Sequence, residues 1–242
     1  MYEPRTYRHW IKDKDLISFD LAVKETDLYI RASTNLRRKA YKLVLKYRDA
    51  LERYIEQHPA FLTSFQPVLV GEDAPQIVKS MSESARKVGV GPMASVAGAI
   101  AEFVGTELLA FSPEIIVENG GDIYLKSLKK RLIGIYAGKS PLTGKIGLEI
   151  NEVDTPLGIC TSSGTVGHSL SYGKADAVVV LSKSAVLADA AATAIGNLIV
   201  QPGDIQGGID FAKGIEGLLG AVIIKDEELG LWGEVKICPM SE

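Results

Sequence analysis

"ADAVVVLSKSAVLADAAATAIGN", residues 175–197, places a continuously apolar run directly before a run of alanines. An apolar run of this kind is typical of a strand that is buried on both faces. Alanine has the highest helix propensity, and its small side chain lets another backbone approach closely, so the second run predicts a buried helix. A strand that leads at once into a buried helix predicts a fold that mixes strands and helices.

The predicted helix carries an aspartate and a threonine among its alanines, Asp189 and Thr193. Residues four apart lie on one helix face, one turn apart, so both oxygens face the same region. A buried carboxylate is costly unless it is paired, hydrogen-bonded or bound to a metal. The two residues therefore form either a structural contact or part of a site for a hard cation such as Mg²⁺. Two ligands do not complete a protein-only site, so the second alternative also implies a phosphate-bearing ligand.

Alternating apolar residues predict strands elsewhere in the chain. The stretch "LISFDLAVKETDLYIRAS" predicts a hairpin of residues 17–23 and 28–32. The stretch "EIIVENGGDIYLKS" predicts two strands around an Asn-Gly-Gly-Asp turn. We expect "RLIGIYAG" and "KIGLEI" to continue the same sheet, and "GLLGAVIIKDEELGLWGEVKI" to end it with a hairpin over Glu227 and Glu228.

A long amphipathic helix is predicted over residues 36–55, with Asn35 as its N-cap and Pro59 beyond its end. Its basic face suggests a surface for an anionic partner or an ordinary solvated face, and we favour the second interpretation. The basic residues considered are Arg38, Lys42 and Lys46.

Two further helices are predicted, "APQIVKSMSESARKVG", which Gly89 stops, and "GPMASVAGAIAEFVGTELLAF", whose small residues predict close packing. The helices near residues 92–110 and 184–200 both carry acids and hydroxyls among small residues, and both border strands. This likeness is the basis for a hypothesis of internal duplication, which composition alone does not establish.

The composition is that of an ordinary globular protein, with 46% hydrophobic and 24% charged residues. No linker or low-complexity stretch divides the 242 residues, so we expect a single domain, 1–242. A net charge of −3 gives no reason to expect nucleic acid as a partner. The two cysteines form no CxxC pair, and neither a secretory signal nor a membrane-spanning run is found, which predicts a cytoplasmic protein without a membrane partner.

Two glycine motifs admit both a structural and a ligand-binding interpretation. "GVGPMA", residues 89–94, follows a helical segment instead of a strand, so it is not a dinucleotide fingerprint. Gly91 either belongs to a plain helix-start turn or leaves backbone N–H groups for a phosphate. "ENGGD", residues 118–122, is ordinary hairpin chemistry, but its glycines also let a ligand approach the backbone beside Asp122.

A third motif, "CTSSGTVGHS" at residues 160–169, gathers hydroxyls, glycines and His168. His168 is interpreted as an acid, base or orienting group, or as a histidine that caps a loop. A hydrolase that uses Ser162 or Ser163 as nucleophile is the less favoured alternative, because no GxSxG elbow and no acidic partner are identifiable.

In chain order, these motifs resemble those of the ApbE-like superfamily, whose well-known members are FAD:protein FMN transferases. "VGPMASVAG" is similar to that family's "LGxIAKG" helix start, and "IIVENGGDIYL" to its "xLVNxGGDI" strand-turn-strand. "ICTSSG" is similar to its "VATSG" strand end, and "ADAAATA" to its "ADALATA" helix. With "CTSSGTVGHSLSYGKADAV" included, most of the chain looks like a smaller branch of that superfamily, of unknown function.

The resemblance implies a T-fold-like α+β architecture, with antiparallel sheets packed against the Ala-rich helices. It implies Mg²⁺ at Asp189 and Thr193, and a flavin nucleotide, FAD or FMN, beside the glycine turn and the TSG strand end. His168 stands where the transferases' histidine opens a "HIIDPxTG" segment, and it is the expected catalytic residue. The residues expected at the nucleotide are Gly91, Asn119, Gly120, Gly121, Asp122, Thr161, Ser162, Ser163 and Gly164.

The sequence departs from the transferases at Ser95, which stands in place of a lysine, and in "HSLSYG", which lacks the Asp-Pro and the Thr-Gly. The loss of a cation and an acid changes the electrostatics of the expected site. The first hypothesis is a Mg²⁺-assisted transferase or hydrolase acting on a flavin nucleotide or another phosphate-bearing small molecule. The second is a non-catalytic protein that binds such a ligand. The third is a structural role in which the Ala-rich helices pack in a homo-oligomer.

Overall fold

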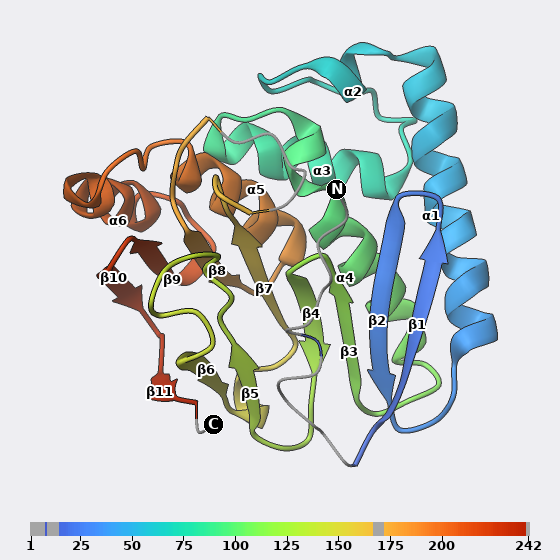
Figure 1. The fold of residues 1–242 in the computed structure, drawn as a ribbon. Coiled ribbons are helices and arrows are strands. Elements are labelled where there is room, and N and C mark those ends of the chain that lie inside the picture. The colour runs from blue at the N-terminus through green and yellow to red at the C-terminus, as the bar shows by residue number, and fades with distance from the viewer. Residues whose placement is uncertain (1–7, 9–14, 167–171, 241–242) are drawn as a thin grey trace.

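The structure, a computed structural model, describes Arg8 and residues 15–166 and 172–240 (Figure 1). The fold is α+β, as predicted, with helices packed on an antiparallel sheet. That the chain forms one domain and that the fold is T-fold-like stay predictions.

The main sheet has eight strands in the order β1-β2-β3-β4-β7-β8-β9-β10, and every neighbouring pair is antiparallel. Short turns join β1 to β2, β3 to β4 and β9 to β10, whereas helices connect β2 to β3 and β8 to β9. The strands are β1 (Ile17–Val23), β2 (Thr26–Ala32), β3 (Ile115–Asn119), β4 (Asp122–Lys126), β7 (Leu157–Ser162), β8 (Ala177–Ser182), β9 (Leu218–Lys225) and β10 (Glu228–Gly233).

Helices cover one face of the main sheet (Figure 1). Their apolar side chains, such as Val44, Met81 and Ile195, share one core with Val117 and Val178 of the sheet. The helices are α1 (Arg37–Gln57), α2 (Ala60–Thr63), α3 (Gln76–Val88), α4 (Val96–Leu108), α5 (Ala185–Gly196) and α6 (Ile205–Lys213), and a 3₁₀ turn, Pro92–Ser95, leads into α4.

A second sheet of three strands covers the opposite face, in the order β11-β6-β5. Its strands are β5 (Arg131–Gly134), β6 (Ile146–Ile150) and β11 (Ile237–Pro239). The expectation that the β5 and β6 segments continue the main sheet was wrong, because β4 pairs directly with β7. The hairpin instead buries Ile133 and Leu148 against Ile116 and Ile159 of the main sheet, which removes a second apolar face from water.

Strand β8 explains the apolar run with which the sequence analysis began, because it is buried on both faces. Val178 and Val180 point into the helix-side core, whereas Val179 and Leu181 point into the core under the second sheet. The residues of α5 that follow are almost all buried as well. The prediction of a buried strand followed by a buried helix is confirmed.

Most element boundaries agree with the sequence prediction, and the differences have local causes. Helix α1 begins at Arg37, whose N–H donates to the side chain of Asn35 at 3.1 Å, although the N-cap position itself is Leu36. The last hairpin turns at Asp226 and Glu227, one residue earlier than expected, because Asp226 adopts a left-handed conformation with φ of 57°.

Each half of the main sheet is built from a hairpin, then helices, then a second hairpin. This order is what an internal duplication would produce, and the duplication stays a hypothesis. Among the described residues no single helix is long and apolar enough to cross a membrane. The pair Gln76–Val88 and Pro92–Leu108 passes that test only together, and it is bent by 104°.

Candidate functional site

The glycine turn between β3 and β4 forms one wall of the candidate site. Gly120 and Gly121 adopt φ of 71° and 109°, a backbone conformation that favours glycine. The N–H of Gly121 donates to Glu118 Oε1 at 2.9 Å, which fixes the turn. The side chain of Asn119 contacts the helix layer, where its Nδ2 donates to the backbone oxygen of Ala97 at 3.1 Å. The turn is thereby attached to the first residues of α4.

Helix α5 brings Asp189 to the same end of α4. The N–H of Gly98 donates to Asp189 Oδ2 at 2.8 Å, so the first turn of α4 directs backbone N–H groups at this carboxylate. Only glycine fits at position 98, because an added Cβ would lie 2.3 Å from the backbone oxygen of Ala185. The small residues of both helices therefore allow the close approach that buries Asp189.

Asp122, at the start of β4, is the second buried carboxylate of the site. Its Oδ1 accepts a hydrogen bond from the N–H of Thr161 at 3.2 Å. Burial, and then the charge of Asp189, raise the pKa of Asp122 well above its ordinary value. We call Asp122 and Asp189 the carboxylate pair.

Burial also raises the pKa of Asp189, to about 7, although hydrogen bonds from the backbone of Gly98 and Ala97 oppose the shift. In the described part of the chain, no lysine or arginine forms an ion pair with either member of the carboxylate pair. Two acids that share a buried region without a cation cannot both ionise easily. A cation would relieve this repulsion.

The other predicted residues lie on the surrounding elements. Thr193 is half-buried one turn beyond Asp189 on α5, and Thr161 and Ser162 end β7. Ser163 and Gly164 follow β7 in a loop, where the N–H of Gly164 donates to Ala175 at 2.9 Å. The structure thus brings Asn119, Asp122, Thr161 and Asp189 together around the start of α4, with Ser163 and Gly164 in the adjoining loop.

Gly91 lies at the start of the 3₁₀ turn, where an added Cβ would lie 1.9 Å from the backbone oxygen of Ser64. Its lack of a side chain therefore serves packing against the segment after α2. Ser95 is fully buried, and its hydroxyl donates to Pro92 at 2.8 Å. His168, the predicted catalytic residue, lies outside the described residues.

Groups of three or more His, Cys, Asp or Glu side chains that could hold a metal are absent from the residues described. The sequence reasoning missed Cys160, whose thiol donates to the backbone oxygen of Ala185 at 3.3 Å and opposes the rise in the pKa of Asp122. A cysteine directly before the threonine and serine of a strand end was the available signal. It also missed Gly98, which the close packing expected of the Ala-rich segments could have indicated.

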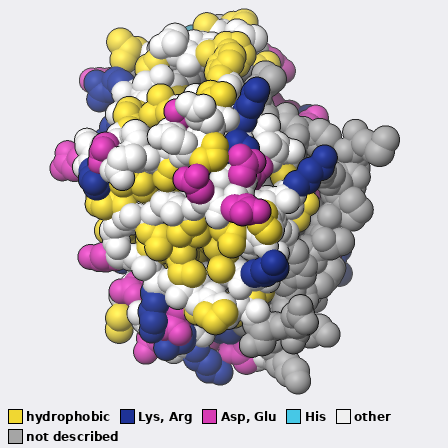
Figure 2. Space-filling model, turned by 60° about the vertical axis from the view of Figure 1, so that its left-hand side comes forward, with side chains coloured by type: hydrophobic (Ala, Val, Ile, Leu, Met, Phe, Trp, Pro, Cys, Tyr) yellow, Lys and Arg dark blue, Asp and Glu magenta, His cyan; other side chains and the backbone are white. Residues whose placement is uncertain are grey.

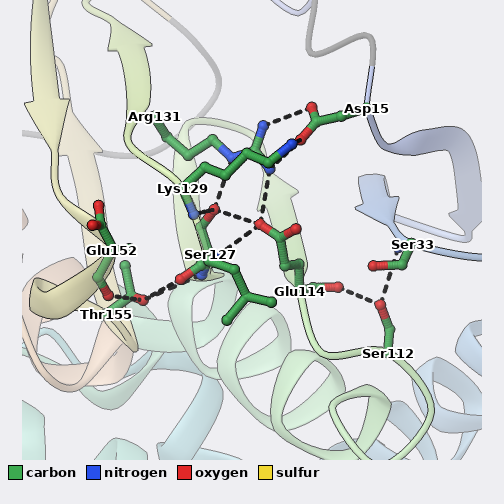
Figure 3. Close-up of polar contacts among 10 residues, drawn as sticks. Asp15, Ser33, Ser112, Glu114, Ser127, Lys129, Arg131, Glu152 and Thr155 are labelled. Carbon is green, nitrogen blue, oxygen red and sulfur yellow. Dashed lines mark hydrogen bonds and ion pairs between the residues drawn. The ribbon is translucent and has the colours of Figure 1, made fainter.

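A second buried polar cluster surrounds Arg131 at the start of β5 (Figure 3). The guanidinium donates to Glu114 at 2.9 Å, to Asp15 at 2.9 and 3.1 Å, and to Ser127 at 2.8 Å. Burial raises the pKa of Glu114, but hydrogen bonds from Leu128, Ser127 and Arg131 outweigh it, so the net pKa is lowered. This cluster contains its own cation, and we call it the Arg131 cluster.

Comparison with known proteins places the chain in a family. The family model described as AbpE bacteria matches residues 8–209. UPF0280 proteins of Methanococcus aeolicus and Methanopyrus kandleri are 42% and 44% identical to this chain, and the matches cover 91% and 90% of it and 91% of each relative. A UPF0280 protein of Methanocaldococcus jannaschii is 43% identical, over 89% of this chain and 90% of its own.

Solved structures with the same fold include a flavinyl transferase ApbE of Pseudomonas stutzeri in its apo form, with a TM-score of 0.61 and 14% identity over 90% of this chain and 93% of that one. The ApbE protein of Thermotoga maritima gives a TM-score of 0.56 and 12% identity over 90% and 97%. At these identities the likeness shows the fold. The chain therefore belongs to the AbpE bacteria family, as an ApbE-like protein of the UPF0280 branch.

Proposed function

We propose that this protein binds a flavin nucleotide with the help of Mg²⁺ and acts as a flavin-nucleotide transferase or hydrolase. The observation that carries the proposal is the carboxylate pair, Asp122 and Asp189, buried without a cation beside a glycine turn and a threonine-serine strand end. The fold supports it, since the Pseudomonas stutzeri protein with this fold is named a flavinyl transferase.

The donor set fits Mg²⁺, because carboxylate and hydroxyl oxygens are the ligands that this hard cation prefers. Asp189 and Thr193 would hold the ion from one helix face, and Asp122 would approach it from β4. The raised pKa values fit as well, since a bound cation favours the ionised carboxylates. The described residues hold no larger cluster of ligands, so waters or phosphate oxygens would complete the coordination.

The proposed reaction breaks a P–O bond of the FAD pyrophosphate. AMP leaves, and the FMN phosphoryl group passes to a hydroxyl of an acceptor protein or to water. Bound Mg²⁺ would neutralise charge on the phosphate oxygens. The open backbone at Gly120 and Gly121 admits the ligand, the hydroxyl of Ser162 on the helix side of β7 offers it a hydrogen bond, and His168 serves as the acid, base or orienting group.

A binding protein without catalysis is the second candidate, and Ser95 favours it. The fully buried Ser95 hydroxyl is already bonded to Pro92, so this position supplies no cation to a phosphate. In this alternative the ligand site remains, but the transition state lacks a positive charge that the resemblance would place there. A cytoplasmic location and a homo-oligomer stay predictions under either candidate.

The test is to incubate the purified protein with FAD and Mg²⁺, alone and with cell lysate, and to look for AMP and for flavinylated protein by mass spectrometry. We expect AMP release with the native protein and none with Asp189→Asn. A thermal shift with FAD but no turnover would favour the binding protein instead.

The matched control is Glu102→Gln. Glu102 is another partly buried carboxylate whose pKa burial raises, but its hydrogen bonds come from Ser184 and the N–H of Val186 at the start of α5. This variant should keep the activity that Asp189→Asn loses. Equal activity of native protein and Asp189→Asn would contradict the metal role.

A further inference from the structure

A groove of about 470 Å³ lies between the outer strand β1 and helix α1. It is separate from the carboxylate pair, which lies between α4, α5, β4 and β7. Leu21 and Ala22 form its strand side, and Tyr41, which is 46% exposed, forms part of its helix side. The remaining lining residues are Arg37, Arg38 and Lys42.

The positive charge of the groove is not compensated by the part of the chain that the structure describes. Arg37, Arg38 and Lys42 form no ion pair there, whereas Lys46 and Arg48, further along the same helix, each bind a carboxylate at 2.5 to 2.7 Å. The sequence suggested two interpretations of this helix, an anionic-partner surface and a solvated face, and it favoured the second. A concave apolar groove lined by unpaired cations favours the first interpretation.

The strand side of the groove is a sheet edge. Strand β1 pairs with β2 on one side, and the main sheet ends there in the described structure. An edge strand presents backbone N–H and C=O groups that an added strand can pair with. A polypeptide can use these groups together with the apolar and cationic side chains, whereas a nucleic acid or a lipid headgroup would use the cations alone.

We propose that this groove binds an extended acidic segment of another protein, which adds as a strand to β1 and directs its carboxylates to Arg37, Arg38 and Lys42. The opposite sheet edge would not bind the same segment, because acidic residues flank β10 and gather on that side of the molecule (Figure 2). The exposed acidic residues next to or within β10 are Asp226, Glu227, Glu228 and Glu234.

The groove also has a fixed relation to the carboxylate pair. Leu21 pairs with Leu28, Leu28 with Asn119 and Asn119 with Asp122, so one row across the sheet joins the two places. Three strand spacings amount to about 14 Å. A partner held at β1 would therefore lie beside the candidate site without occupying it. The docking proposal does not depend on the reaction proposed above.

The test is a selection of random twelve-residue peptides displayed on phage, on the full chain and, as counter-selection, on the double variant Arg38→Glu with Lys42→Glu. We expect the full chain to enrich peptides with several Asp or Glu residues among apolar ones. Fluorescence anisotropy with a labelled selected peptide should show binding at least about tenfold weaker in the double variant. Hydrogen exchange should show protection of the β1 amides by the peptide.

The control is Lys87→Glu, an exposed charge reversal on α3 outside the groove, which should bind the peptide like the native chain. Circular dichroism of the double variant checks that it is folded, and Tyr41→Ala gives a second groove variant without charge reversal. The proposal is overturned if the native chain enriches no peptides over the double variant or if the enriched peptides lack acids. It is likewise overturned if phosphatidylserine vesicles or a second copy of this chain bind the groove and the peptides do not.

Discussion

The Arg131 cluster and the carboxylate pair both bury carboxylates, but only the first contains a cation that forms an ion pair with them in the described structure. In the Arg131 cluster the guanidinium bonds Glu114 at 2.9 Å and Asp15 on its other side (Figure 3). The carboxylate pair is as deeply buried, with Asp122 7% and Asp189 9% exposed. In the described structure these two acids accept hydrogen bonds from the backbone N–H groups of Gly98 and Thr161.

The pKa directions follow from this difference. The pKa values of Glu114 and Asp15 are lowered, because hydrogen bonds from Arg131 and its neighbours favour the ionised form. The pKa values of Asp122 and Asp189 are raised, because burial, which disfavours the ionised form, has the largest effect on both. A buried cluster whose acids are paired with a cation of the same chain needs no ligand and can have a purely structural role. A buried acidic pair that lacks a cation is more typical of a functional site.

Replacing Arg131 by Met should have the largest effect on stability. It leaves Glu114 buried without its cation, and the loss of one partner of a buried ion pair typically costs about 3–5 kcal/mol. We expect the free energy of unfolding in urea to fall by an amount of this order. A loss under about 1 kcal/mol would mean that the cluster is less buried or less dependent on Arg131 than its geometry indicates.

Replacing Asp189 by Asn should have a smaller effect on the free energy of unfolding, because the amide retains an acceptor for the Gly98 N–H and removes a repulsive charge. Its main effect should be on Mg²⁺. We expect added Mg²⁺ to raise the thermal midpoint of the native protein and to leave that of the variant unchanged. Equal Mg²⁺ shifts in both proteins would remove Asp189 from the proposed site.

The two places should also respond to pH with opposite signs. Asp189, with a folded pKa of about 7, keeps its proton when the unfolded chain has lost it, so the free energy of unfolding falls as pH rises from about 4 to 7. Glu114 and Asp15 have lowered pKa values, so their contribution is present above about pH 4 and is lost as pH falls further.

Urea unfolding measured across this pH range in the presence of EDTA checks both slopes. Asp189→Asn should flatten the first slope, and Mg²⁺ should restore stability above about pH 7, because the ion replaces the proton. Part of the slope should remain, because the pKa of Asp122 is raised as well. A first slope that is unchanged in Asp189→Asn would assign it to Asp122 or another group.

Replacing Lys129 by Ala should have the smallest effect. Lys129 bonds Asp15 at 3.1 Å, but its side chain is 64% exposed, and exposed ion pairs contribute about 0–1 kcal/mol. We expect a change in the free energy of unfolding below about 1 kcal/mol, which added salt reduces further. A larger loss would show that the Arg131 cluster extends to its exposed rim.

The sequence predicted the elements that depend on short-range patterns. Gly89 ends α3 in the left-handed conformation, with φ of 76°, as its position predicted. The β3–β4 hairpin and the strand-helix order of β8 and α5 were equally local, and their boundaries follow from turn residues and burial. The motif order also identified the superfamily, which the fold comparison supports.

The contacts between distant segments could not be predicted in the same way. Arg131 and Asp15 are 116 residues apart, and no local pattern marks them as partners. The placement of β5 and β6 in a second sheet depends on which apolar faces remain uncovered after the main sheet forms. The burial of the Asp122 and Asp189 carboxylates depends on how closely α4 and α5 approach each other. The alanine content predicted close packing of these helices but not the distance between them.

Strand β8, buried on both faces, has a consequence for the motions of the candidate site. The amides of β7 and β8 belong to the innermost part of the sheet, and we expect their exchange with solvent to require a free energy close to that of global unfolding. Asp122, Thr161 and Asp189 are carried by this region or by elements packed directly on it. Their arrangement therefore exists before any ligand arrives, and a ligand bound there would lose little affinity to ordering the protein.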